Sequence, residues 1–177
     1  MPELSSKAYT SMPMATGDGT EREMSQATVR GARPALFLRI ASVLTFIHAL
    51  LHTIGGVFGK VSPGPAEVAA NAMKANAFVW MGSTHTFWGF YRGMGLAVGI
   101  SLTAEAIVFW QLASLSTNNS LGLRPIYCTF LIAYLAIALN SFEHFFLAPV
   151  IMEILIAGCM AGAFLTTKYP ESPVKAR

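Results

Sequence analysis

Two histidines stand four residues apart in the apolar run FIHALLHTIGG, residues 46–56. Because residues four apart share a face of a helix, His48 and His52 would project to the same side. Ionisable side chains inside an apolar span are costly, and they mark functional sites by default. Such a pair can bind a metal ion, and a neutral imidazole close to a carboxyl group can transfer protons.

The helix that carries the histidines is predicted to turn them away from lipid. Ala41, Thr45 and Gly55 extend the same stripe of small and polar residues. The bulky aliphatic side chains lie mostly away from this stripe: Leu36, Val43, Ile47, Leu50 and Ile54. The histidines are therefore expected to face other helices.

Later apolar runs hold polar groups that could join the histidines. They are Glu105 in the second run, Asn140 in the third, Glu153 in the fourth, and Tyr127, Tyr134 and Ser141 at heptad spacing in the third. At about 1.5 Å rise per residue, both histidines, Asn140 and Glu153 come to nearly one depth in the bilayer. Glu105 lies roughly 6 Å nearer the inner end. The spacing thus predicts one intramembrane polar layer.

Two classes of function fit this layer. The first is a membrane-embedded enzyme that isomerises, cyclises or dehydrates a lipophilic small molecule, for example in a biosynthetic pathway. Its predicted catalytic groups are His48, His52, Glu105 and Glu153, and its predicted pocket residues are Asn140, Trp88, Tyr91 and Tyr134. The second class is a non-catalytic accessory or carrier protein, because intramembrane polar groups often serve only as interhelical hydrogen bonds worth about 0.6–2 kcal/mol. No cofactor is predicted, and no metal, because no second ligand pair accompanies the histidines.

The composition is that of an integral membrane protein. Of the 177 residues, 54% are hydrophobic and only 12% are charged, and the mean hydropathy is +0.52. Soluble domains carry roughly 25% charged residues. The net charge of +3 comes from basic residues scattered singly, which does not indicate a nucleic-acid surface. Cys128 and Cys159 lie in apolar runs without a CxxC motif, so no redox-active thiol pair is expected.

The sequence predicts an all-α fold, a four-helix transmembrane bundle. Residues 1–33 are predicted to be a disordered cytoplasmic tail, 34–167 the membrane domain and 168–177 a short cytoplasmic tail. The spans are predicted at 35–57, 92–115, 126–145 and 147–167, each near the ~20 residues that cross a bilayer. A short interfacial helix is expected within 62–80, followed by aromatic residues at headgroup level.

The distribution of Lys and Arg predicts that both termini are cytoplasmic. Eight basic residues then lie on the inner side and three on the outer side: Arg22, Arg30, Arg33, Arg39, Arg124, Lys168, Lys175 and Arg177 against Lys60, Lys74 and Arg92. Three pairs of glycines at i,i+4 spacing offer faces for close helix packing, within one chain or between chains: Gly89/Gly93, Gly95/Gly99 and Gly158/Gly162. A homo- or hetero-oligomer is therefore compatible with the sequence.

Two stretches resemble a family of small, uncharacterised four-helix membrane proteins found mostly in bacteria. The end of the first run matches its G-H-T-x-G-G-like pattern at His52, Thr53, Gly55 and Gly56. The stretch at 82–96 matches G-S-x-x-x-[FY]-W-x-F-Y-x-G-x-G-L at Gly82, Ser83, Phe87, Trp88, Phe90, Tyr91, Gly93, Gly95 and Leu96. The resemblance covers about residues 35–167. It implies the four-helix fold, brings no known activity, and associates His52 with the aromatic stretch at the outer ends of the first two helices.

Overall fold

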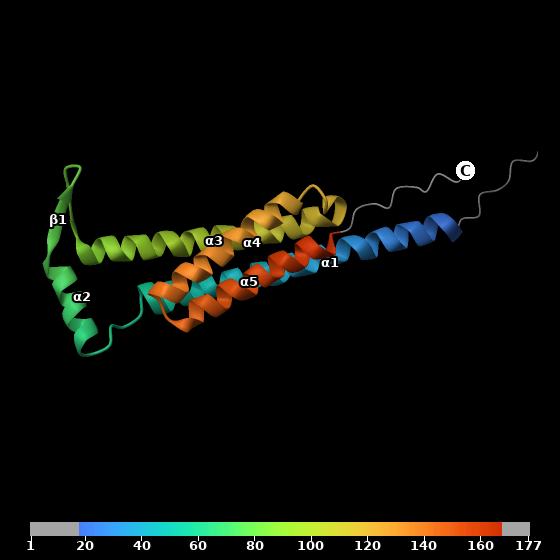
Figure 1. Cartoon of the computed structure of the whole chain (residues 1–177). Coiled ribbons are helices and arrows are strands. Elements are labelled where there is room, and N and C mark those ends of the chain that lie inside the picture. The colour runs from blue at the N-terminus through green and yellow to red at the C-terminus, as the bar shows by residue number, and fades with distance from the viewer. Residues whose placement is uncertain (1–17, 168–177) are drawn as a thin grey trace, which may run out of the picture.

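Four long helices form the bundle in the computed structural model, which describes residues 18–167. They are α1 (Asp18–Leu51), α3 (Phe87–Asn119), α4 (Arg124–His144) and α5 (Leu147–Thr166). Each contains a stretch long and apolar enough to cross a membrane, with mean hydropathy between 1.6 and 2.0. The helices lie alongside one another (Figure 1). The predicted four-helix transmembrane bundle is thus confirmed.

The ends of the helices differ from the predicted ends. α1 begins at Asp18, inside the predicted tail, and Pro34 lies within the helix instead of opening it. Residues 20–30 hold several good helix formers, including Glu, Arg, Met, Gln and Ala, which favour this extension. The rest of the predicted tail, 1–17, and the C-terminal segment 168–177 lie outside the described residues. After Leu51 the chain continues as a π-helical turn, η1 (His52–Val57).

A small unit of one helix and one hairpin connects α1 to α3. The expected interfacial helix is α2 (Pro65–Ala75), with a proline in its first turn. A hairpin of β1 (Ala77–Trp80) and β2 (Ser83–Thr86) follows, which the sequence reasoning did not predict. Figure 1 shows α2 crossing the direction of the long helices, beyond the end of α1. We call this end of the bundle the hairpin end, and the end with the α3–α4 turn the opposite end.

The hairpin moves the start of α3 from the predicted residue 92 to Phe87. Its two-residue turn, Met81–Gly82, has positive φ at both positions, 49° and 82°, as a type I′ turn requires. The side chain of Thr86 then caps α3, because its Oγ1 accepts a hydrogen bond from the Gly89 N–H at 3.0 Å. Five residues that were expected in a connector therefore belong to the helix.

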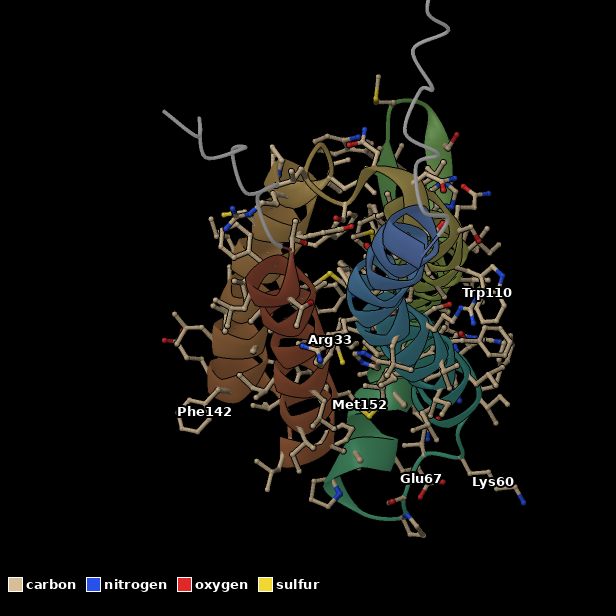
Figure 2. All side chains as sticks on the ribbon, turned by 90° about the vertical axis from the view of Figure 1, so that its right-hand side faces the viewer. Arg33, Lys60, Glu67, Trp110, Phe142 and Met152 are labelled. Atoms are coloured by element: carbon tan, nitrogen blue, oxygen red, sulfur yellow. The ribbon has the colours of Figure 1, made fainter. Side chains whose placement is uncertain are left out.

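α1 is the central helix of the bundle. It packs against α3 on one side and α5 on another, and α4 packs against α5. Glycines permit close approach at two contacts of α1 and its continuation η1. A Cβ on Gly95 of α3 would lie 2.8 Å from the Val57 side chain of η1, and one on Gly162 of α5 would lie 2.6 Å from the Phe37 ring of α1. Viewed along the bundle, Trp110 and Phe142 project outward at its two edges (Figure 2), where lipid would surround them.

Candidate functional site

The stripe of α1 that carries His48 faces the bundle interior. Ala41 and Thr45 are fully buried and His48 is 9% exposed. The aliphatic side chains that were expected to face lipid are 41–65% exposed: Leu36, Val43, Ile47, Leu50 and Ile54. Helical periodicity therefore placed the first histidine correctly, on the side of the other helices.

Two polar side-chain pairs connect different helices near the middle of the bundle. The hydroxyl of Tyr134 on α4 donates to Oε2 of Glu105 on α3 at 2.7 Å. The hydroxyl of Ser141 on α4 donates to Oε1 of Glu153 on α5 at 2.9 Å. Tyr134 is 1% exposed and Glu153 is 3% exposed, whereas Glu105 is half-buried.

These pairs belong to one group of residues, because Tyr134 lies within electrostatic reach of both glutamates and next to Thr45 of α1. His48 is one helical turn from Thr45 on the same buried face. We call the group the mid-bundle cluster: Thr45, His48, Glu105, Tyr134, Ser141 and Glu153. All four long helices contribute to it, but His52 and Asn140, two members of the predicted polar layer, are not part of it.

The mid-bundle cluster contains polar atoms that the bundle does not satisfy. Oγ1 of Thr45, Nδ1 of His48 and Oε2 of Glu153 are buried and have no hydrogen-bond partner within the described part of the chain. Leaving such a group unpaired in the interior costs roughly 1–3 kcal/mol. Packing alone does not explain why an imidazole and a second carboxyl oxygen occupy these positions.

His52 lies apart from the mid-bundle cluster, at the hairpin end. It begins the π-helical turn, and its Nε2 lies 2.9 Å from the carbonyl oxygen of Gly95 on α3. Because a carbonyl oxygen only accepts, Nε2 carries the proton in this bond. His48 lies four residues earlier, one helical turn further into the bundle. His52 therefore fastens η1 to α3 and stands between the cluster and the hairpin end.

The structure places Asn140 on the exposed side of α4, away from the predicted pocket. Its neighbour Ser141, 3% exposed, is the residue that bonds to Glu153. A rotation of about 100° per residue separates adjacent side chains on a helix, so only one of the two can face α5. The heptad spacing of Tyr127, Tyr134 and Ser141 already indicated the correct face, since all three are buried.

The two aromatic residues predicted for the pocket are remote from the mid-bundle cluster. Trp88 and Tyr91 stack on each other with ring centroids 5.7 Å apart, and the Lys74 ammonium lies 5.1 Å from the Trp88 ring centroid. Both precede Glu105 on α3 by 14 to 17 residues, or about 21–26 Å at the helical rise. They form part of the hairpin end and do not line the cluster.

In residues 18–167, no three His, Cys, Asp or Glu side chains gather closely enough to hold a metal ion. The fold and the outward-facing apolar residues define the class: this is a multi-pass membrane protein whose four helices contact the lipid bilayer. Comparison of the chain with protein-family models, with curated proteins and with solved structures gives no match.

Proposed function

We propose that the protein is a membrane-embedded enzyme that performs acid–base chemistry on a lipophilic small molecule at the mid-bundle cluster. The observation that carries the proposal is that two titratable groups of the cluster hold unsatisfied buried atoms, Nδ1 of His48 and Oε2 of Glu153, beside the hydrogen bond between Tyr134 and Glu105 in the same cluster. General acid–base catalysis needs one group that accepts a proton and another that donates one within the same site. The cluster offers two carboxyl groups, a phenol and an imidazole.

The seam between α3 and α4 supports access from the lipid. These helices meet mainly through long side chains, such as the rings of Phe109 and Phe130 at 4.8 Å and the Tyr134–Glu105 hydrogen bond. Glu105 is half-buried there, whereas Glu153 lies behind it in the interior. In this proposal a lipophilic molecule enters at the seam and meets Glu105 first.

The proposed roles follow from these positions. Glu105 takes a proton from the substrate, and Tyr134 stabilises developing negative charge on a substrate oxygen through its hydroxyl. Glu153 and His48 return a proton to the substrate or accept one from it. Isomerisation, cyclisation and dehydration all reduce to such paired proton transfers and need no cofactor.

The test compares lipid-soluble metabolites of cells that contain the parent protein, no protein, or a single variant. Glu105→Gln keeps an oxygen that can accept the Tyr134 hydrogen bond but cannot take a proton. We expect the product to disappear and its precursor to accumulate, with normal protein level and stability. Glu143→Gln is the matched control, because this glutamate is 61% exposed beyond the cluster. Unchanged product with a stable Glu105→Gln protein would rule out the catalytic role.

The second candidate is an accessory or carrier protein in which the cluster only holds the bundle together. The two interhelical bonds favour it, since Tyr134–Glu105 joins α3 to α4 and Ser141–Glu153 joins α4 to α5. Under this alternative, every variant that keeps the fold keeps the function. The resemblance to the bacterial four-helix family likewise remains a proposal.

A further inference from the structure

The two halves of the bundle are packed differently. The largest side chains that are less than 2% exposed all lie at the level of the mid-bundle cluster or toward the opposite end. They are Pro34, Leu38, Thr45, Phe109, Ser116, Tyr127, Tyr134, Ile156 and Met160. Leu112, Ala113 and Ala163 complete this apolar core. A closely packed layer about 10 Å thick, the rise between Tyr134 and Tyr127 on α4, therefore separates the cluster from the opposite end.

The hairpin half has fewer fully buried large side chains and a more polar interior. His52, Thr53 and Thr103 are half-buried there, and the Thr103 hydroxyl donates to the Gly99 carbonyl at 2.8 Å. Among the described residues of this half, the largest buried apolar side chain is Val57, at 6% exposure.

We infer that the mid-bundle cluster exchanges protons with water at the hairpin end alone, by a path past His52, and that the apolar core insulates it from the opposite end. The inference deepens the proposed function and rests on it, because a proton-transferring site must recover its protonation state after each turnover. The chemical event is a proton transfer only: hydronium at the hairpin end loses a proton, and a cluster carboxylate gains an O–H bond.

The ionisable groups along this path come from every helix that borders it. His48 follows His52 on α1, and Glu105, Tyr134 and Glu153 lie at its inner limit on α3, α4 and α5. At the entrance, α3 contributes Tyr91 and Arg92. The Arg92 guanidinium lies 4.9 Å from the Phe58 ring centroid, so this cation borders the way into the bundle.

Cysteine accessibility tests the path without reference to catalysis. The full chain first receives Cys128→Ser and Cys159→Ser, which remove its two thiols. The probe is then Thr45→Cys. Serine, threonine and cysteine are close in size, so all three changes should fit the native bundle. A membrane-impermeant, water-soluble thiol reagent is added to vesicles of each orientation. Only a hydrated thiolate reacts, so we expect Thr45→Cys to react on the order of tenfold faster than Leu112→Cys in the core. Its labelling should occur only from the side that labels Met81→Cys, at the 92% exposed hairpin tip.

His48→Cys provides an independent probe should the first variant fold poorly, and gel filtration with intrinsic fluorescence checks both for a native bundle. Labelling of either cluster probe from the side opposite the hairpin would overturn the inference. Equal reactivity of the cluster and core cysteines, or a folded cluster probe inert from both sides, would overturn it as well. Since labelling reports water access and metabolite analysis reports catalysis, either proposal can fail while the other stands.

Discussion

Replacing His48 with leucine should leave the bundle at least as stable as the parent. The imidazole is 9% exposed, its Nδ1 is buried without a partner, and no hydrogen bond joins it to another described residue. Removing an unsatisfied buried polar group recovers roughly 1–3 kcal/mol, and leucine adds apolar contacts of similar volume. Allowing for imperfect fit of the branched side chain, we expect the free energy of unfolding to rise by about 0–2 kcal/mol.

The control for this change lies on the same face of α1. Ser42, 7% exposed, donates to the carbonyl oxygen of Ala106 on α3 at 2.7 Å. Ser42→Ala removes that interhelical bond, and the loss should be about 0.6–2 kcal/mol. Reversible unfolding in detergent micelles, followed by intrinsic fluorescence, measures both variants against the parent. A His48→Leu protein destabilised as much as Ser42→Ala would show that His48 has a structural partner, and the reasoning from its unsatisfied atom would be wrong.

Three further predictions concern the bundle and its orientation. Ser141→Ala should lower the free energy of unfolding by about 1 kcal/mol, because a buried carboxyl on α5 loses its donor. Asn140→Ala should leave the free energy of unfolding unchanged, and equal effects of the two variants would contradict the observed face of α4. Gly162→Ala should destabilise the bundle by about 1–3 kcal/mol, because the added methyl group meets an aromatic ring of α1. No neighbouring atom lies within 4 Å of the position that a methyl group on Gly158 would take, so Gly158→Ala should have the melting temperature of the parent or a slightly higher one. In cells, a cysteine at Met81 should be labelled from outside and both termini should be cytoplasmic; external labelling of the α3–α4 turn would reverse this topology.

The spans and the inward face of α1 could be predicted because hydropathy and helical periodicity are strong signals. Both signals are averages over many residues. Such averages do not decide which of two adjacent residues faces the bundle interior. Asn140 and Ser141 are both polar and lie where a span ends. The depth of Asn140 in the span placed it in the predicted layer, although the heptad series from Tyr127 through Tyr134 reaches Ser141. Periodicity was the better guide there than depth in the span.

The hairpin could not be predicted with the same rules. Its strands, AFVW and STHT, are four residues each, too short to establish an alternating pattern beside a long apolar helix. The turn places a methionine at φ 49°, whereas Asn-Gly or Asp-Gly would have identified a type I′ turn. The remote position of Trp88 and Tyr91 follows from the same omission, because α3 begins earlier and carries them to the hairpin end.

Lipid tails are as apolar as leucine, so helices in a membrane associate through close packing and interhelical hydrogen bonds. α1 reaches α3 and α5 through glycines at their contacts, and those pairs need few polar groups. α3 and α4 lack such close backbone packing, and the Tyr134–Glu105 bond joins them instead. A structural role therefore accounts for one half of the mid-bundle cluster even if no reaction occurs there. It does not account for His48, which makes no hydrogen bond to another described residue and leaves a buried nitrogen unsatisfied. Thr45 Oγ1 is unsatisfied as well, but a hydroxyl is a poor general base. The case for an enzyme consequently depends most on His48, the titratable group of the cluster that bonds to no other described residue.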